Sequence, residues 1–253
     1  MAAYWTKYRD WNQALIVKIS IPSSDLLGAR NKLGDWYLHT PWGQILLNHE
    51  LEYLTKSVCA AYNEVVLQIG TLEWEPPVLD RTCYRKFFIL DTNEKNQQGQ
   101  MVASLQALPI HGESVDVVIM PHILEFADDQ HQLLREVDRI LKPEGHLYYL
   151  GFAPLGLFGL LHYWPGNKNQ APWCGHFIGQ HKMLDRLSLL NFEAKVAARF
   201  RIKPNKPGFT AAYAIKAIKR RYTVIPLGPA RVRPQLMPAG IMERKICKDS
   251  HGS

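Results

Sequence analysis

Short apolar runs recur along this chain and predict buried strands. The runs are VVLQI (65–69), KFFIL (86–90), VDVVIM (115–120) and HLYYLGF (146–152), with a weaker one at 100–104. Apolar runs of this length with few polar interruptions are typical of strands that are covered on both faces. A glycine, an aspartate and a proline follow the first three runs at positions 70, 91 and 121. Such residues predict the ends of those strands.

Between the strands, the apolar positions take helical spacing and predict helices over 43–61, 129–141 and 180–190. Asp128 is expected to cap the second helix, and Pro143 to stop it. The inward-facing positions of the three stripes are Leu47, Leu51, Leu54, Val58, Ala61, Leu133, Leu134, Val137, Ile140, Leu141, Met183, Leu184, Leu187 and Leu190.

Strands that alternate with helices favour an α/β fold, with a Rossmann-like, doubly wound and mostly parallel sheet. Residues 192–202 and 210–218 follow each other as two alternating segments. They predict a closing hairpin, and therefore an antiparallel C-terminal edge strand. We expect an N-terminal extension (1–42) packed on a domain at 43–221, and a basic, proline-containing tail at 222–253.

Composition is that of a single globular domain with a core. The chain has 253 residues, of which 47% are hydrophobic and 21% charged. No segment has the roughly 18 apolar residues of a membrane span, and the start MAAYWTKYRDW does not resemble a signal peptide. The four cysteines form no CxxC pair. We therefore expect a cytoplasmic protein with reduced thiols. The oligomeric state is left open.

Charge is distributed unevenly. Residues 1–194 carry 16 Lys and Arg against 21 Asp and Glu, whereas residues 195–253 carry 14 against 2. A basic end suits a nucleic acid or an anionic surface, and equally a solvated tail. Aromatic residues are interleaved with the basic ones, but Phe200 and Tyr213 are expected to face the sheet, where they could not stack on bases. Nucleic acid stays an alternative partner.

Two residues mark a candidate cofactor site. In a doubly wound sheet, ligands lie beyond the carboxyl ends of the strands, where the strand order reverses. The first strand then ends in a glycine that lets the backbone approach the ligand, and the second ends in an acid for ribose hydroxyls about 20 residues later. Gly70 and Asp91, which are 21 positions apart, fit this spacing.

A longer pattern carries a family resemblance. ALP (107–109), ESVDVVIMPHILE (113–125) and LLREVDRILKPEG (133–145), with the strand that follows, resemble the class I S-adenosylmethionine-dependent methyltransferases, in particular the type 11 methyltransferase-domain family. The order and spacing of these pieces match together over about fifty residues, and the resemblance extends over roughly 43–220. It implies S-adenosylmethionine as the cofactor.

The resemblance also implies the residues that hold this cofactor. Its first loop falls on 68–74, where the family has an acid and three alternate glycines. Here Gln68 replaces the acid, Gly70 is retained, and Leu72 and Trp74 replace the other glycines. The implied cofactor-binding residues are Gln68 and Gly70 in this loop, Asp91 on the ribose, Ser104 and Leu105 at the adenine, and Met120 and Pro121 near the sulfonium.

Candidates for the chemistry lie beyond the fourth and fifth strands. His122 is the candidate general base, although it equally suits a structural hydrogen bond. Glu125 matches a glutamate that is common in the family, and we expect it to be structural. The loop at 153–173 is where the acceptor pocket is expected, or else an aromatic cluster; its candidates are Phe158, His162, Tyr163, Trp164 and Trp173.

A metal site is not expected. His162, Cys174, His176 and His181 lie near one another in the sequence, but their spacing matches no common zinc pattern.

These observations predict a methyltransferase that acts on a small-molecule acceptor. The replacements at Gln68, Leu72 and Trp74 leave open an inactive binding or scaffold protein of the same fold. The basic end leaves open a protein that binds or modifies RNA.

Overall fold

The structure is a computed structural model, and it describes residues 24–58, 63–72, 84–92, 101–156, 175–202 and 210–220. The predicted tail at 222–253 lies outside these residues, as do all four cysteines. Among the helices of the described ranges, none is long and apolar enough to cross a membrane.

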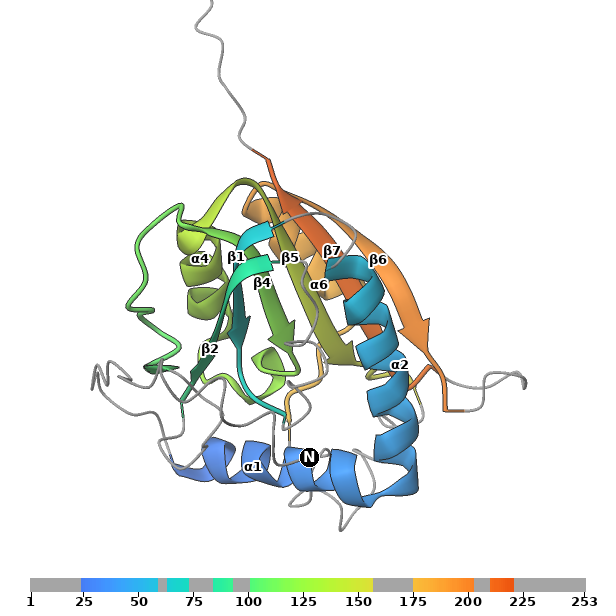
Figure 1. The fold of residues 1–253 in the computed structure, drawn as a ribbon. Coiled ribbons are helices and arrows are strands. Elements are labelled where there is room, and N and C mark those ends of the chain that lie inside the picture. The colour runs from blue at the N-terminus through green and yellow to red at the C-terminus, as the bar shows by residue number, and fades with distance from the viewer. Residues whose placement is uncertain are drawn as a thin grey trace, which may run out of the picture. The chain divides into compact units, whose positions relative to one another are not determined.

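A mixed sheet of seven strands forms the centre of the described structure (Figure 1). Its order is β3-β2-β1-β4-β5-β7-β6. The strands are β1 (Asn63–Ile69), β2 (Tyr84–Asp91), β3 (Met101–Val102), β4 (Val115–Pro121), β5 (Leu141–Phe152), β6 (Phe192–Phe200) and β7 (Ala212–Lys219). The first five are parallel, and β7 is antiparallel to both β5 and β6. The predicted Rossmann-like sheet and its closing hairpin are confirmed.

The strand order reverses between β1 and β4, since β2 lies on one side of β1 and β4 on the other. In sheets of this kind a ligand site lies at such a reversal, beyond the carboxyl ends of the strands. A ligand site is therefore expected at the edge formed by the carboxyl ends of β1, β2 and β4.

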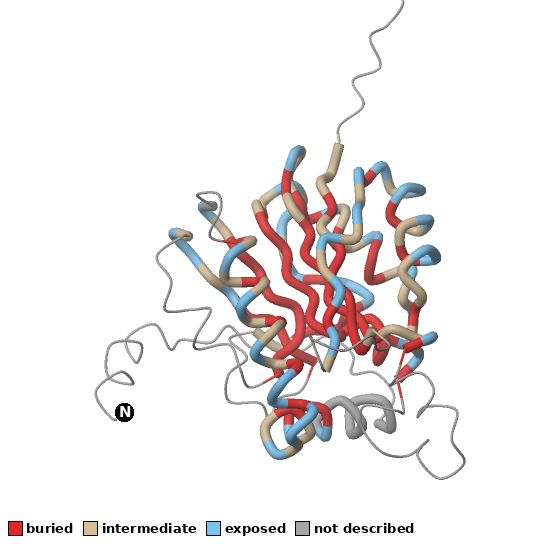
Figure 2. Tube along the Cα trace, turned by 90° about the vertical axis from the view of Figure 1, so that its right-hand side faces the viewer, coloured by how far each residue is buried: buried red, intermediate tan, exposed pale blue. Residues whose placement is uncertain are grey.

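The helices are α1 (Ser24–His39), α2 (Pro41–Val58), the 3-10 turn η2 (Leu124–Phe126), α4 (Gln130–Ile140) and α6 (Gln180–Leu189). Buried side chains of α1 and α2 share one apolar cluster with β1, β4 and β5, and those of α4 and α6 share a second with the other face of the sheet. Figure 2 shows the buried strands lying between less buried helices. The sheet is thus covered on both faces, which explains its continuous apolar runs.

Helix α1 lies across the carboxyl ends of the parallel strands (Figure 1). It lies within the region predicted as an N-terminal extension (1–42), for which the sequence predicted no helix. Leu33 and Tyr37, four positions apart, are both fully buried. Gly28 and Gly34 weaken the intrinsic helix signal of this segment. Its helix is therefore stabilised by tertiary packing.

A tight corner joins α1 to α2. The hydroxyl of Thr40 donates to the Trp36 carbonyl at 2.6 Å and accepts from the Gly43 amide at 3.0 Å. A Cβ atom on Gly43 would collide with the backbone of Trp36 and Tyr37. Glycine at this position therefore lets the start of α2 approach the end of α1 closely.

The ends of α4 differ from the prediction by one or two residues. Its N-cap is Asp129 rather than Asp128, because the Asp129 carboxylate accepts from the amides of His131 and Gln132. Its C-cap is the extended residue Leu141, which already pairs with Val115 as the first residue of β5. Strand pairing therefore ends the helix at Ile140, three residues before Pro143.

Candidate functional site

Buried polar side chains gather at the carboxyl edge of the sheet. Among the described residues, the polar or charged side chains that are buried are Glu50, Gln68, Thr71, Asp91, Thr92, Ser104, His122 and Glu125. All except Glu50 lie at or directly after the ends of β1, β2, β3 and β4. Burying polar groups costs free energy unless they find partners. Their concentration at one edge therefore marks the candidate site.

The end of β1 has the backbone form that the sequence predicted. Gly70 has a φ of 94°, a conformation that favours glycine. Its amide donates to the Leu90 carbonyl at 2.7 Å, which joins the ends of β1 and β2. The buried Gln68 donates from Nε2 to the Gly70 carbonyl at 2.8 Å. Gln68 therefore supports the turn itself.

Asp91 lies at the end of β2 with 1% of its surface exposed. Its Oδ2 accepts from the hydroxyl of Thr71, and its Oδ1 accepts from the Thr92 amide at 2.6 Å. These bonds orient the carboxylate at the edge. Ser104 and Leu105 follow the neighbouring strand β3 and are 6% and 8% exposed. The structure thus gathers Gly70, Asp91 and Ser104 at the ends of adjacent strands.

The first loop departs from the family pattern in a way that the structure explains in part. Leu72, which stands at a family glycine position, is 1% exposed. It belongs to the apolar cluster that includes Leu33 and Tyr37 of α1. The substitution therefore packs the loop against the N-terminal helices. Trp74 lies outside the described residues.

His122 takes an unusual backbone conformation directly after β4. Its φ is 51°, and its amide donates to the Leu150 carbonyl at 3.0 Å. Met120 and Pro121, just before it, are buried. A non-glycine residue with positive φ costs free energy, and such residues cluster at functional sites. Stacking of the imidazole on Phe152, with ring centroids 4.0 Å apart, helps to hold this conformation.

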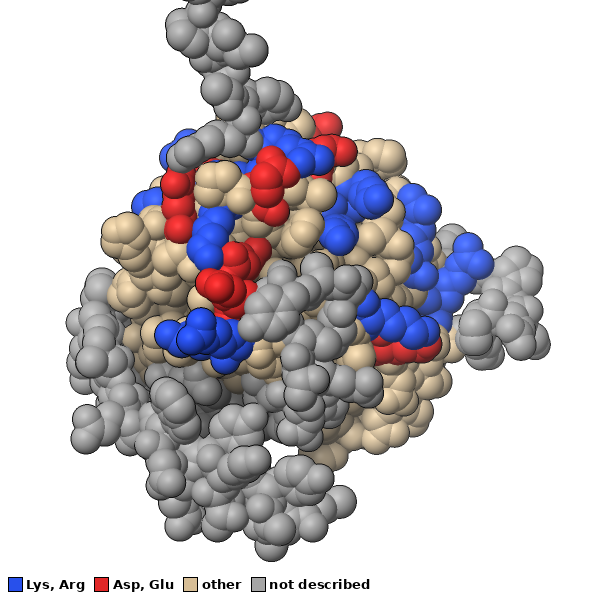
Figure 3. Space-filling view, turned by 45° about the horizontal axis from the view of Figure 1, so that its top comes forward, with Lys and Arg blue, Asp and Glu red and all other residues tan. Residues whose placement is uncertain are grey.

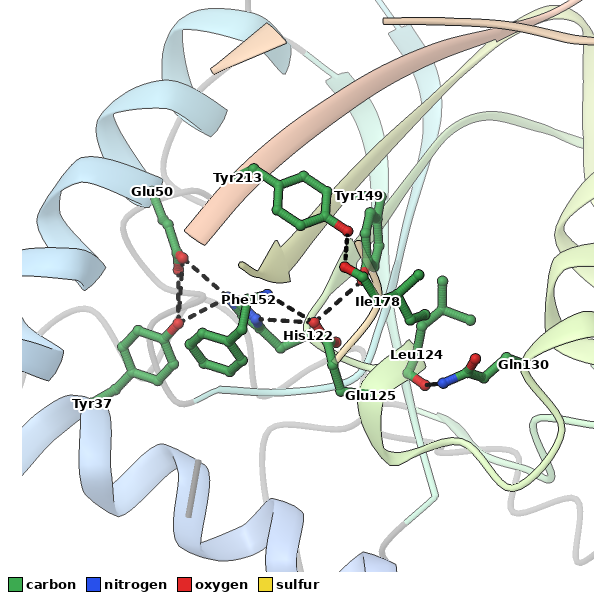
Figure 4. Close-up of polar contacts among 10 residues, drawn as sticks. All are labelled: Tyr37, Glu50, His122, Leu124, Glu125, Gln130, Tyr149, Phe152, Ile178 and Tyr213. Atoms are coloured by element: carbon green, nitrogen blue, oxygen red, sulfur yellow. Dashed lines mark hydrogen bonds and ion pairs between the residues drawn. The ribbon is translucent and has the colours of Figure 1, made fainter. Parts of the chain in front are cut away.

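The His122 side chain is the centre of a buried polar cluster (Figure 4). Its Nε2 lies 2.8 Å from the Tyr37 hydroxyl and 3.0 Å from Glu50 Oε1. On the other side, its Nδ1 lies 3.8 Å from Glu125 Oε1. The Tyr37 hydroxyl also donates to Glu50 Oε2 at 3.1 Å. One imidazole therefore lies between two carboxylates, with no solvent exposure of the three side chains.

The two carboxylates determine the charge of His122. Burial by itself lowers the pKa of the imidazole, but attraction to the carboxylates of Glu50 and Glu125 and the hydrogen bond with Glu50 outweigh it and raise the pKa to about 9. His122 therefore carries a proton at neutral pH and forms a buried ion pair. A protonated imidazole donates hydrogen bonds and does not accept a proton.

Glu125 links this cluster to β5. Its Oε1 accepts from the Phe152 amide at 2.9 Å and from the Tyr149 hydroxyl at 3.2 Å. Burial and the charge of Glu125 raise the pKa of Tyr149 well above its ordinary value, so Tyr149 stays a donor. Glu125 thus bonds the main chain and side chains of the next strand, as its predicted structural role requires.

A cavity of about 680 Å³ lies on the α4 and α6 side of the same edge. Its walls are the segment after β4, the residue Pro154 after β5, and the start of α6 with the residues before it. The lining residues are Ala127, Asp128, Asp129, Gln130, His131, Pro154, His176, Phe177, Ile178 and Lys182. Its volume is within the usual range for small-molecule sites. The five residues predicted for an acceptor pocket between 158 and 173 lie outside the described residues.

The structure also describes other residues that the sequence analysis singled out. Phe200 and Tyr213 are 6% and 1% exposed, so both face the core as expected. His176 and His181 are exposed, whereas His162 and Cys174 are outside the described residues. Within the described ranges, no three His, Cys, Asp or Glu side chains form a group that could hold a metal ion.

Sequence reasoning missed Tyr37 and Glu50. Glu50 did leave a signal, because the buried positions of α2 are Gly43, Leu46, Glu50, Leu54 and Val58, most of them four apart. A carboxylate in the middle of such a stripe requires a buried partner. The predicted stripe used Leu47 and Leu51, which are only half-buried, so Glu50 escaped notice. Tyr37 left no such signal.

The sheet order, the reversal point and the retained acid define the Rossmann-like methyltransferase fold, and comparisons with known proteins agree. Residues 84–149 match the model of a family described as a methyltransferase domain. Over 169 residues the chain is 32% identical to the uncharacterized protein YafS of Escherichia coli (strain K12), covering 66% of this chain and 69% of that protein. The chain belongs to the class I methyltransferase family.

A more distant relative and two solved structures of similar fold were also found. The chain is 26% identical over 135 residues to a malonyl-[acyl-carrier protein] O-methyltransferase of Halorhodospira halophila, which covers 53% of this chain and 43% of that protein. The fold of this chain matches a SAM-dependent methyltransferase of Thermotoga maritima with a TM-score of 0.57 and 18% identity, over 75% of this chain and 96% of that one. A SAM-dependent methyltransferase of Aquifex aeolicus matches with a TM-score of 0.51 and 14% identity, over 75% and 98%.

Proposed function

We propose that this chain is a methyltransferase that uses S-adenosylmethionine and acts on a small-molecule acceptor. The observation that carries the proposal is Asp91. It is a buried carboxylate at the end of β2, beside the reversal of strand order, in a chain of the class I methyltransferase family. This is the position at which dinucleotide and nucleoside sites of such sheets have their ribose acid.

The residues at this edge fit the cofactor. The Asp91 carboxylate is oriented by the Thr71 hydroxyl and the Thr92 amide, and a carboxylate at the end of the second strand is the acceptor for ribose hydroxyls in sheets of this kind. Gly70 would let the backbone approach the ligand, and Ser104 and Leu105 would border the adenine. When bound, S-adenosylmethionine supplies a methyl group activated by its positively charged sulfur.

The methionine end of the cofactor would meet a weaker partner than usual. Gln68 is neutral, and its amide group already bonds Gly70. An amide oxygen attracts an ammonium group less strongly than a carboxylate does. Met120 and Pro121 would border the sulfonium from the end of β4. We therefore expect the affinity for the cofactor to depend mostly on the adenosine half, where Asp91 lies.

The cavity between α4 and α6 is our candidate for the acceptor. The cavity borders the segment that follows β4 and η2. Asp91 is at the end of β2, which is separated from β4 by β1. The end of β4 would then lie between cofactor and acceptor, where the methyl group must pass. The lining combines Phe177 and Ile178 with Lys182 and two histidines, which suits a small acceptor with apolar and polar parts.

The predicted role of His122 as a general base stays a prediction. A base must be neutral, and with a pKa of about 9 only about 1% of the imidazole is neutral at pH 7. If His122 is the base, the rate of methyl transfer rises about tenfold per pH unit up to pH 9.

Calorimetric titration tests the cofactor. The purified chain is titrated with S-adenosylmethionine and with S-adenosylhomocysteine, and we expect binding in the micromolar range. Asp91→Asn removes the charge and weakens binding about tenfold or more. Asp185→Asn, on the exposed side of α6, is the matched control and leaves affinity unchanged. Equal affinities in the two variants would contradict the proposed role of Asp91.

One observation favours a second function, a binding or scaffold protein with a closed site. Leu72 packs with Leu33 and Tyr37, and Gln68, Asp91 and Ser104 are all buried. Absence of binding at millimolar ligand would make this the leading function. Binding to the wild-type chain, lost in Asp91→Asn, would exclude it.

A further inference from the structure

The N-terminal helices and the carboxyl edge of the sheet are joined by polar bonds that cross a long stretch of sequence. Tyr37 of α1 and His122 after β4 are 85 positions apart, and Glu50 of α2 and His122 are 72 apart. All three side chains are fully buried. Together with the bond from Tyr37 to Glu50, these contacts connect α1, α2 and the end of β4 at one point (Figure 4).

This point lies at the carboxyl edge, where we propose that the cofactor binds. Helix α1 runs across the carboxyl ends of the strands (Figure 1), and its Leu33 and Tyr37 pack in one cluster with Leu72 of the first loop. The predicted cofactor residues Gln68 and Asp91 are 0% and 1% exposed. A ligand reaches these side chains only if a covering element moves away.

The geometry points to Tyr37, Glu50 and His122 as a latch. These positioning residues tie α1, which lies across the carboxyl edge, to α2 and to the end of β4, and their separation admits the cofactor. The latch bears on cofactor entry only if the proposed function holds, but its existence does not depend on that function.

The chemistry of these contacts suits an element that opens. Buried ion pairs contribute little net stability compared with apolar contacts of the same size, because each charge loses its hydration. Water can replace every bond of the latch when it separates. His122 would then keep Glu125 as a partner, while Glu50 and Tyr37 move away with their helices.

The groups that face His122 come from every element around it. They are Tyr37 from α1, Glu50 from α2, Glu125 from η2 and the Phe152 ring from β5. Tyr149 acts through its bond to Glu125. Of these groups, only Tyr37 and Glu50 belong to the covering helices. Substituting them weakens the latch without touching the bonds between Glu125 and β5.

The first test is amide hydrogen exchange of the full chain without ligand. Tyr37→Phe removes one hydroxyl, and Glu50→Gln removes one charge at nearly constant volume. We expect exchange in α1 to rise about tenfold in both variants, since bonds to charged groups are the stronger ones. Exchange in α4 serves as the internal reference and stays within about twofold.

The matched control is Glu52→Gln on the same helix, which removes an exposed pair with Lys56. It leaves exchange in α1 unchanged. Two outcomes overturn the latch: exchange in α1 that matches this control, or equal acceleration in α1 and α4, which indicates general destabilisation only. If Glu50→Gln does not fold, Tyr37→Phe decides by the same criteria.

The second test is the titration of the His122 imidazole by nuclear magnetic resonance. The wild-type chain is expected to keep His122 protonated at pH 7, and Tyr37→Phe to leave it so. Glu50→Gln lowers the pKa of His122 by about one unit or more, because the nearest charge is gone. A neutral His122 at pH 7 in the wild-type chain overturns the ion pair, and the exchange measurement then decides whether hydrogen bonds alone hold the latch.

The third test uses S-adenosylhomocysteine as the probe in rapid mixing. Tyr37→Phe is expected to raise its association rate about fivefold, whereas Glu52→Gln does not change it. An unchanged rate in Tyr37→Phe overturns the entry role. If the wild-type chain binds no S-adenosylhomocysteine, the proposed function fails, while the exchange measurement still decides whether the latch exists.

Discussion

The two edges of the sheet hold their charges in opposite ways. At the amino edge, Lys142 pairs with Asp116 at 2.8 Å and Arg220 with Glu193 at 2.8 Å, and these side chains are between 24% and 67% exposed. At the carboxyl edge, Glu50, His122 and Glu125 are all fully buried. Figure 3 shows basic and acidic groups lying next to each other on the outer surface seen from the amino side.

This comparison distinguishes exposed charges, which keep the surface hydrated, from buried charges, which belong to the candidate site. Exposed pairs lie in water and contribute little to stability. A buried cluster carries a large desolvation cost, so it persists only where the fold supplies partners on all sides. The carboxyl edge is also where the retained acid and the reversal of strand order lie. We infer that the burial of charge, more than its presence, distinguishes the functional edge of this sheet.

The largest effect is expected from Glu125→Ala. This change leaves the Phe152 amide and the Tyr149 hydroxyl without their acceptor and removes one of the two carboxylates beside His122. We expect a loss of about 3–5 kcal/mol in the free energy of unfolding, measured with urea. Glu144→Ala at the amino edge, which breaks an exposed pair with Arg220, costs less than about 1 kcal/mol. Equal losses would remove the distinction between the edges.

The next effect is a pH dependence of stability. The pKa of His122 is raised from 6.5 to about 9 in the folded chain. The protonated imidazole therefore makes its full contribution to the free energy of unfolding below pH 6.5. This contribution declines between pH 6.5 and 9 and is lost above pH 9. The total is on the order of 3 kcal/mol.

The measurement compares urea unfolding of the wild-type chain and His122→Asn at pH 6, 7.5 and 9. Asparagine tolerates the positive φ of this position, so the backbone conformation is expected to be the same in both chains. The stability difference between the two chains is expected to shrink as the pH rises. A difference that is independent of pH would mean that His122 is neutral in the folded chain.

The smallest effect concerns an exposed charge at the carboxyl edge. Asp129 caps α4 through the amides of His131 and Gln132, whereas its neighbour Asp128 does not. Asp129→Ala is expected to cost about 1 kcal/mol of unfolding free energy, and Asp128→Ala less than about 0.5 kcal/mol. A larger loss of unfolding free energy in Asp128→Ala than in Asp129→Ala would identify Asp128 as the N-cap.

Local pattern was sufficient for most of the fold. The apolar runs at 65–69, 86–90 and 115–120 all lie within observed strands, and the alternation after residue 192 became the closing hairpin. Elements with strong periodicity were found because one buried stripe determines the type of the element. The start of β5 was missed, since Leu141 begins that strand through its pairing with Val115, which the local pattern does not show.

The residues of the candidate site likewise divide into those that the local sequence predicted and those that it did not. Gly70 and Asp91 could be predicted, because the ribose acid of such folds follows the glycine of the first strand by about 20 residues. Tyr37 could not be predicted, since its segment contains two glycines and no clean stripe. The charge of His122 could not be predicted either, because two glutamates from different elements produce it.

The sequence by itself determined the order of strands and helices, the family and the retained acid at the carboxyl edge, all of which depend on residues close to one another along the chain. Only the tertiary structure decided what surrounds His122. Tyr37 and Glu50 reach it across 85 and 72 positions. Such contacts depend on how helices dock on a sheet, and periodicity specifies which face is buried but not which side chains meet there.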